Sequence, residues 1–150
     1  MPRVSLVPAS YVLLRRSGAV LLQLRHNTGY MDGYWTAGAA GHGELGETAV
    51  DSAVREVKEE LGVDVDPVDM LASSVMQRTD GTAEPREQRV DWFFVCDSWR
   101  GEPTILEPRK CAALAWFDLD ALPERVPEYE LLALGAIRDE RTSTLLSYGF

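Results

Sequence analysis

The chain has 150 residues, of which 45% are hydrophobic and 26% charged, values typical of one globular domain over residues 1–150. It carries 15 Lys and Arg against 24 Asp and Glu, a net charge of −9. This balance excludes a nucleic-acid polymer as the expected partner, because no basic stripe can replace the counterions of a phosphate backbone. It permits a small phosphorylated ligand, since bound cations can reverse the sign of one local site.

Neither end of the chain nor its apolar runs predict export or membrane insertion. No apolar run approaches the 18 residues of a bilayer-spanning helix, so no membrane partner is expected. The N-terminal stretch MPRVSLVPAS lacks an apolar signal core, which makes a cytoplasmic location the default expectation. Cys96 and Cys111 each lie beside apolar residues, and we expect buried free thiols rather than a disulfide.

The first elements in chain order are two expected strands, over residues 4–16 and 19–25, joined by a tight turn at Ser17 and Gly18. Residues 26–41 are rich in glycine and show no helical period, so a loop is expected there. Three aromatic residues crowd that loop: Tyr30, Tyr34 and Trp35. Their rings could line a pocket and stack on a base, or they could cover one end of the core.

Residues 48–61 are predicted to form an amphipathic helix. Its expected core face repeats at helical spacing and consists of Val50, Ala53, Val54, Val57 and Leu61. Three carboxylates, Glu56, Glu59 and Glu60, share another stripe, centred ~130° away at ~100° per residue. Like charges at this spacing destabilise a bare helix by roughly 0.2–0.5 kcal/mol per pair. A hard divalent cation would offset the repulsion; the alternative is a purely structural helix with a solvated acidic stripe.

The second half of the chain alternates apolar runs with polar turns. Further strands are expected over residues 70–79, 89–99 and 111–119, and a loop over residues 120–127. A second amphipathic helix is expected over residues 128–139, with the core candidates Leu131, Leu132, Leu134 and Ile137. The tail, residues 141–150, supports no assignment. Because strands outnumber helices and the longer helix lies between strands, we predict an α/β fold with a mixed sheet and helices on both faces.

Residues 41–63 contain the most specific pattern of the chain, G-x5-E-x7-R-E-V-x-E-E-x-G-V. This pattern resembles the signature of the Nudix hydrolases position by position. At ~5% per residue type, its seven Gly, Glu and Arg positions alone would match by chance roughly once in 10⁹ starting points. The flanking strands, the aromatic loop and the C-terminal helix are also similar to a small Nudix domain, so the resemblance covers nearly the whole chain. It implies a Nudix-type α/β/α sandwich.

The resemblance also implies roles for the residues of the motif. Nudix hydrolases cleave a diphosphate linked to another moiety, commonly a nucleoside, with Mg²⁺ or Mn²⁺ as cofactor. Glu59 and Glu60 correspond to metal ligands, and Glu56 to a further ligand or to the general base. The implied catalytic set is Arg55, Glu56 and Glu59, with the identity of the base left open. Gly41, Glu47 and Gly62 correspond to structural positions, where Glu47 braces the loop against the helix.

One more metal-binding carboxylate is expected from a later loop. Glu107 is our candidate, because it follows SWRGEPTILE, which resembles the corresponding stretch of small nucleoside-triphosphate hydrolases of the family. The alternatives are Glu87, Asp91, Glu102 and a purely exposed role for Glu107.

Two positions depart from the family pattern. The family usually has a second glycine immediately before Gly41, where this chain has Ala40; a backbone carbonyl of Ala40 could still bind metal, provided the backbone there does not need positive φ. Gly43 occupies a position that is more often aliphatic, so the loop is expected to be looser.

Candidate substrate-binding residues lie outside the motif. Arg25, at the end of the second strand, and Arg89, at the start of a later one, are the preferred phosphate-binding cations, against a default of solvated surface arginines. Tyr34 and Trp35 are the aromatic candidates for contact with the substrate.

The sequence therefore predicts a Mg²⁺-dependent hydrolase of the diphosphate linkage in a nucleoside di- or triphosphate or a close derivative, with nucleotide-pool sanitising as one role. The alternatives are a hydrolase of ADP-ribose-like compounds or nucleotide sugars and a non-catalytic nucleotide-binding Nudix module. A binding module would be expected to lose carboxylates of the REVxEE segment, and this chain retains them. The partner expected is a small nucleoside phosphate, and the chain is expected to be a monomer or a homodimer.

Overall fold

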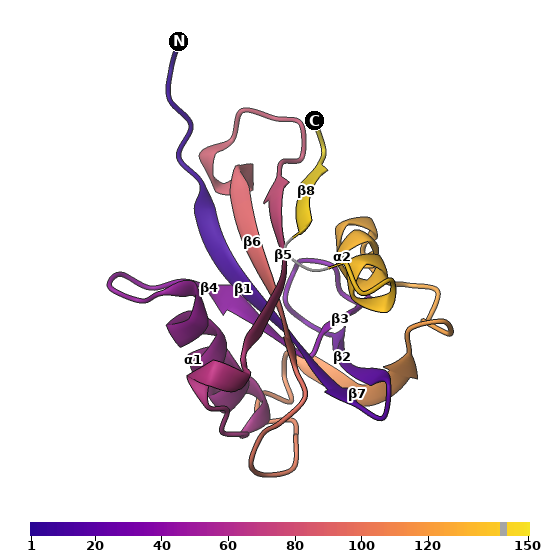
Figure 1. Ribbon diagram of the computed structural model, residues 1–150. Helices are drawn as coiled ribbons and strands as arrows, with labels where there is room; N and C mark the ends of the chain where they lie inside the picture. Colours follow the sequence, from indigo (N-terminus) through magenta and orange to yellow (C-terminus); the bar gives the residue numbers. More distant parts are fainter. Residues whose placement is uncertain (142–143) are drawn as a thin grey trace.

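The computed structural model describes residues 1–141 and 144–150 and has one mixed β-sheet between two helices (Figure 1). The helices are α1 (Ala49–Leu61) and α2 (Glu128–Arg138). The strands are β1 (Val7–Arg16), β2 (Ala19–Arg25), β3 (Trp35–Ala37), β4 (Ala39–His42), β5 (Leu71–Arg78), β6 (Arg89–Cys96), β7 (Cys111–Asp118) and β8 (Thr144–Tyr148). Two short 3₁₀ helices are η1 (Pro67–Asp69) and η2 (Pro85–Glu87).

Strand β1 is the centre of the sheet, whose order is β3-β2-β1-β6-β5-β8. β1 pairs in parallel with β6 from Val7↔Arg89 to Leu14↔Cys96, and antiparallel with β2 and β4. β7 pairs with β2, and β8 runs parallel to β5. The predicted mixed α/β sheet with helices on both faces is confirmed.

The two faces of the sheet bury separate clusters because side chains alternate along a strand. Tyr11 and Leu13 of β1 pack in the cluster that contains the buried residues of α2. Val12 and Leu14 pack in the cluster that contains Ala53, Val57 and Leu61 of α1. The aliphatic face predicted for α1 is therefore confirmed, with Val50 and Val54 partly buried beside it.

The ends of α1 follow from its sequence. Thr48 is the N-cap: its hydroxyl accepts a hydrogen bond from the Asp51 N–H, and the Asp51 carboxylate accepts one from the Thr48 N–H. At the other end Gly62 adopts φ 73°, a left-handed conformation that a side chain would disfavour, and its N–H binds the Lys58 carbonyl. These caps fix the helix directly beside the glycine-rich segment before it.

Replacing Thr48 with Ala should lower the free energy of unfolding by about 1 kcal/mol, because one N-terminal N–H loses its acceptor. For a chain of this length that corresponds to a melting temperature roughly 2–4 °C lower. Thermal unfolding followed by circular dichroism measures the change, with Thr104→Ala on an exposed loop as the control. Equal melting temperatures for wild type and Thr48→Ala would contradict the capping role.

Two expectations from the sequence were wrong, and a segment without an assignment contains a strand. The stretch 26–41 is not all loop. Residues 35–37 form β3, which pairs with β2, and β4 begins at Ala39 and pairs with β1. The unassigned tail contains β8, although residues 142–143 lie outside the described part. Leu131 and Leu132 are 40% and 42% exposed, while Tyr129, Glu130, Ala133, Leu134, Ala136 and Ile137 form the buried side of α2.

Cys96 and Cys111 are free and buried, as predicted. Among the described residues, no helix is long and apolar enough to cross a membrane.

Candidate active site

Arg55 is the hub of the motif, since its guanidinium holds groups from three segments. Its Nε and Nη2 donate to the two oxygens of Glu47, at 2.7 and 2.9 Å, in a bidentate pair. Nη2 also donates to the His42 carbonyl at 3.1 Å. Nη1 donates to Glu56 at 2.7 Å and to Glu59 at 3.2 Å. The loop before the helix and two of the three carboxylates are thus fixed by one side chain.

Glu56 is buried against the backbone of Gly41. Its side chain is 9% exposed, and a Cβ built on Gly41 would overlap its carboxyl group, with Oε2 at 2.6 Å. Burial raises the pKa of Glu56, while the hydrogen bond from Arg55 lowers it. Glycine at position 41 is therefore required by the close approach of a carboxylate.

Glu60 lies deeper than Glu59 and faces β4. Its Oε2 accepts hydrogen bonds from the Ala40 N–H at 3.1 Å and from the Gln23 amide at 3.5 Å. Burial is the largest of the effects that raise the pKa of Glu60 to about 8, and the charges of Glu56 and Glu107 add to it. A buried carboxylate with carboxylate neighbours requires a positive partner if it is to ionise at neutral pH.

The loop that carries Glu107 is attached to the end of α1. The Thr104 N–H donates to the Leu61 carbonyl at 3.0 Å, and the Leu106 N–H donates to the Glu60 carbonyl at 3.4 Å. Glu107 and Glu60 line the same small cavity, together with Gln23 and Cys111. The structure therefore brings Glu107 to the carboxylate cluster.

The alternatives to Glu107 lie elsewhere. Glu102 pairs with Arg16, Asp91 with Arg78, and Glu87 with Arg86.

The donor set fits a divalent cation. Within residues 1–141 and 144–150, no three acidic, histidine or cysteine side chains lie in an arrangement that could hold a metal ion as they stand. Arg55 instead spans Glu56 and Glu59, and Glu60 has only uncharged hydrogen-bond donors. Carboxylate and carbonyl oxygens are the ligands that Mg²⁺ and Mn²⁺ prefer, and burial, followed by the charges of Glu56 and Glu107, raises the pKa of Glu60.

A polar cavity of about 210 Å³ adjoins the cluster through β4, whose residues Ala40, Gly41 and His42 line it. Arg25 and Arg89, both proposed from the sequence as phosphate-binding cations, also line this cavity. The Nε of Arg25 donates to the Tyr30 carbonyl at 2.7 Å. The structure therefore places both arginines next to the motif.

The aromatic candidates lie in different places. The Trp35 ring packs edge-to-face on Phe117, with centroids 4.9 Å apart, at the margin of the core. The guanidinium carbon of Arg125 lies over the Tyr34 ring, 4.7 Å from its centroid, and Tyr34 lines a larger outer cavity. Tyr30 lines both the polar cavity and this outer one.

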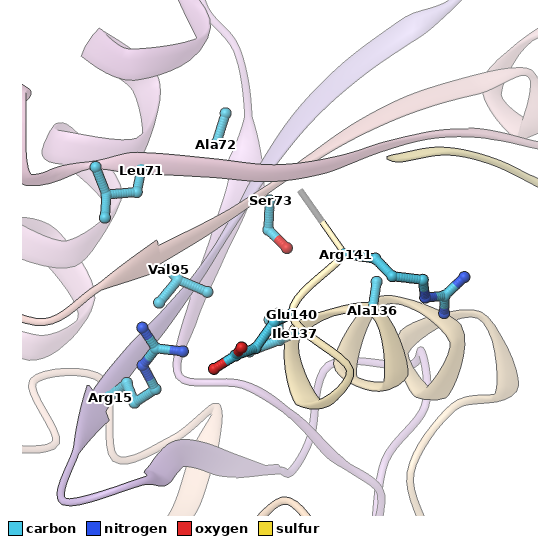
Figure 2. A pocket seen from close by; sticks show the side chains of 9 residues that line it. All are labelled: Arg15, Leu71, Ala72, Ser73, Val95, Ala136, Ile137, Glu140 and Arg141. Carbon is cyan, nitrogen blue, oxygen red and sulfur yellow. The ribbon is translucent and has the colours of Figure 1, made fainter. Parts of the chain in front are cut away.

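Another cavity, of about 270 Å³, lies at the C-terminal end of α2 (Figure 2). Figure 2 shows Val95 and Ile137 on its wall, with the charged side chains of Arg15, Glu140 and Arg141 around it. None of the carboxylates of the motif lines this cavity.

Sequence reasoning missed Gln23 and Glu130. The amide of Gln23 donates to Glu60 and to the carbonyls of Ala37 and Gly38. Glu130 lies in a helix expected to expose its polar residues, yet it is 2% exposed and lines the polar cavity. Glu130 precedes Leu134 and Ile137, two predicted core residues, by four and seven residues, and this helical spacing was the available signal.

Comparison with known proteins agrees with this geometry. The family model of the NUDIX domain matches residues 5–134. An isopentenyl-diphosphate Delta-isomerase of Cereibacter sphaeroides is 31% identical over 119 residues, covering 79% of this chain and 67% of the relative. A putative mutator protein MutT4 of Mycobacterium tuberculosis is 30% identical over 122 residues, covering 73% of this chain and 43% of the relative.

Among solved structures, a MutT NUDIX hydrolase from Burkholderia pseudomallei superposes with a TM-score of 0.78 at 26% identity, covering 89% of this chain and 98% of that one. The chain thus spans about two thirds of the isomerase and nearly all of the solved hydrolase. The chain belongs to the NUDIX family and is a Nudix hydrolase.

Proposed function

We propose that this protein hydrolyses the diphosphate linkage of a nucleoside di- or triphosphate, or of a close derivative, with Mg²⁺ or Mn²⁺ as cofactor. The observation that supports it is the cluster of Glu56, Glu59 and Glu60, of which Arg55 holds Glu56 and Glu59. A cavity lined by Arg25 adjoins this cluster through Ala40 and Gly41 of β4. Carboxylates for a cation and an adjoining cationic cavity are the two requirements for binding a phosphorylated compound.

The metal would be held by Glu56, Glu59 and Glu60, with Glu107 and the Ala40 carbonyl as further ligands. When bound, a divalent cation neutralises charge on phosphate oxygens and lowers the pKa of a coordinated water. Glu56, which is fixed by the hydrogen bond from Arg55, would accept the proton of the attacking water. Glu59 is exposed and accepts a hydrogen bond from the same guanidinium, and it is the second candidate for the general base. Arg25 and Arg89 would orient the substrate in the polar cavity.

A panel of substrates with Mg²⁺ tests the proposal, with orthophosphate and pyrophosphate measured separately. The panel contains nucleoside di- and triphosphates, ADP-ribose and a nucleotide sugar, so the alternative hydrolases are separated by which compound is cleaved. Pyrophosphate from triphosphates and orthophosphate from diphosphates would indicate different positions of attack. Nucleotide binding without any product would support a non-catalytic module instead.

Isomerisation of a prenyl diphosphate is a second candidate, favoured by the 31% identity to the Cereibacter sphaeroides isomerase. Both kinds of substrate carry a diphosphate, so the same metal cluster could hold either. Isopentenyl diphosphate in the same panel separates them, because isomerisation moves its double bond without releasing phosphate.

Replacing Arg55 with Lys should lower kcat for nucleotide hydrolysis by about 10- to 100-fold, since a lysine keeps the charge but cannot hold the bidentate pair with Glu47 and also orient Glu56. KM should change less, because Arg55 lies behind the carboxylates rather than in the polar cavity. Steady-state kinetics measures both constants. Lys58→Arg, on the exposed side of the same helix, is the matched control, and an unchanged kcat in Arg55→Lys would refute the orienting role.

A further inference from the structure

The loop that carries Glu107 is long and connects β6 to β7. Its residues 97–110, all of which the structure describes, contain no helix or strand. The Glu107 side chain is exposed, so its position relative to Glu60 depends on the backbone that carries it. A loop of this kind holds a functional side chain accurately only when other contacts fix the loop.

A stack of two tryptophans fixes the first half of this loop. Trp99 lies nearly parallel to Trp116 of β7, with ring centroids 6.1 Å apart and 15° between the ring planes. The guanidinium carbon of Arg16, at the end of β1, lies over both rings, 5.3 and 4.7 Å from their centroids. The Nη1 and Nη2 of Arg16 donate to the two carboxylate oxygens of Glu102 at 3.2 and 3.1 Å. Two residues of the loop are therefore joined to the sheet through one arginine.

The tryptophan stack is the stronger part of this arrangement. The pair of Arg16 with Glu102 is exposed, and exposed ion pairs add little to stability. Trp99 and Trp116 instead pack, partly buried, against the apolar cluster that contains Leu61 of α1. Burial of a large aromatic ring contributes more than an exposed ion pair, and the cation over the ring faces adds to it. Loss of Trp99 should therefore release the loop more than loss of Glu102.

The fixed part of the loop lies directly against the residues that follow α1. The Arg100 N–H donates to the Asp64 carbonyl at 2.9 Å, and the Asp64 N–H donates to the Arg100 carbonyl at 3.0 Å. A Cβ built on Gly101 would lie 3.7 Å from the Gly62 carbonyl oxygen, so the two segments are in contact. Glu60 lies only two residues before Gly62, so the stack sets the distance between the loop and the end of the helix.

The segment from Glu102 to Glu107 is stiff enough to transmit this position. Each of these two residues precedes a proline, which disfavours the helical region and favours an extended backbone. Between them, the Thr104 N–H and the Leu106 N–H donate to carbonyls at the end of α1. A displacement at the stack is therefore passed to Glu107 rather than absorbed between the two glutamates.

We propose that Trp99 is a positioning residue for Glu107. Its stack with Trp116 and Arg16 fixes the loop, and a divalent cation would then contact the carboxylates of Glu107 and Glu60 together. This inference rests on the proposed function for the presence of the cation. It differs from a purely structural role, because loss of the stack should weaken metal binding only while residue 107 is a carboxylate.

The test variant is Trp99→Leu, which removes the stack and leaves an apolar side chain in its place. Trp92→Leu is the matched control, because Trp92 also packs, partly buried, against the cluster around α1 but lies on β6, outside the loop. Trp99→Phe is the conservative variant, since it keeps an aromatic ring beside the guanidinium of Arg16. The readout is the affinity for Mn²⁺, measured by calorimetry.

Trp99→Leu should weaken Mn²⁺ binding by about 10-fold, as expected when a residue that orients a metal ligand is lost. Trp99→Phe and Trp92→Leu should both stay within about twofold of wild type, since neither change releases the loop. The same substitutions are then made in Glu107→Gln, which should itself weaken Mn²⁺ binding by about 10-fold. In that background Trp99→Leu should add less than about twofold, because the ligand that it positions is already absent.

Equal losses from Trp99→Leu with and without the Glu107 carboxylate would overturn the inference, and an equally large loss in Trp92→Leu would show that Trp99 acts through the fold. An unchanged affinity in Glu107→Gln, or no Mn²⁺ binding by wild type, would also overturn it, because Glu107 would then have no cation to contact. Binding of Mn²⁺ does not depend on hydrolysis. A wild type that binds Mn²⁺ but cleaves nothing in the panel would therefore refute the proposed function alone.

A second variant covers the case in which Trp99→Leu does not fold. Arg16→Met removes the guanidinium from both rings and from Glu102 while keeping an unbranched side chain. A loss of about threefold in Mn²⁺ affinity that disappears in the Glu107→Gln background would support the inference. An unchanged affinity, or the same loss in both backgrounds, would refute it.

Discussion

Replacing Glu59 and Glu60 together by Gln should reduce metal-dependent phosphate release by on the order of 10³-fold or more, because two of the carboxylates proposed to hold the cation lose their charge. The same double variant should be at least as stable as wild type without metal. Glu60 is buried beside Glu56 and Glu107, and its raised pKa shows that folding disfavours its charged form. Loss of activity with retained stability is therefore the expected combination.

Three measurements check this result: product release, thermal unfolding at pH 8 without metal, and calorimetric titration with Mg²⁺ and Mn²⁺. Glu84→Gln, exposed on a distant loop, is the control. Unchanged product release would remove the catalytic assignment of both residues. Lost activity with unchanged metal affinity would mean that these carboxylates do not hold the cation.

The substitution Gly41→Ala should be nearly inactivating, although it adds a single methyl group. The new Cβ would overlap the carboxyl group of Glu56, so either Glu56 must leave its position or β4 must separate from α1. Displacing the proposed base or ligand by about 1 Å is enough to cost on the order of 10²-fold in rate. We expect kcat to fall by that factor or more, with a loss of stability of about 1–3 kcal/mol from the overpacking.

Gly43→Ala is the matched control two residues along the chain. Its Cβ would meet only the Pro8 side chain, with Cγ at 3.6 Å and Cβ at 3.9 Å, which are ordinary van der Waals contacts. It should retain near wild-type activity and stability. If Gly41→Ala were as active as Gly43→Ala, Glu56 would have no role that depends on its position against the strand.

The parts of this fold that sequence predicts are those fixed by local rules. The helix α1 has its periodicity, its capping residues and its terminal glycine within one continuous segment, so its bounds differ from the predicted ones by a single residue. Strands β3 and β4 are short, and β4 is composed of Ala, Gly and His, which have little intrinsic preference for strand structure. They form because β1 and β2 offer edges for pairing, which no local pattern can show.

The residues of the site also divide into those that local sequence rules predict and those that depend on long-range packing. Arg55, Glu56, Glu59 and Glu60 lie on one helix, and their spacing alone places them together. The contact of Glu130 with Ala37 joins positions 93 residues apart and depends on how α2 packs on the sheet. The exposure of Leu131 and Leu132 has the same cause, since the packing of α2 turns Tyr129 and Glu130 inward in their place.

The parallel pairing of β1 with β6 has a consequence for the order of events during synthesis. Helix α1 docks on Val12 and Leu14 of β1 and on Phe94 and Cys96 of β6. When α1 leaves the ribosome, half of that docking surface has not yet been made, and long-range parallel pairing is slow. The carboxylates of α1 then have only the strands β1 to β4 to lie on. We expect a nascent chain that ends before residue 89 to have no organised metal site, so that the complete cluster appears only after β6 has joined β1.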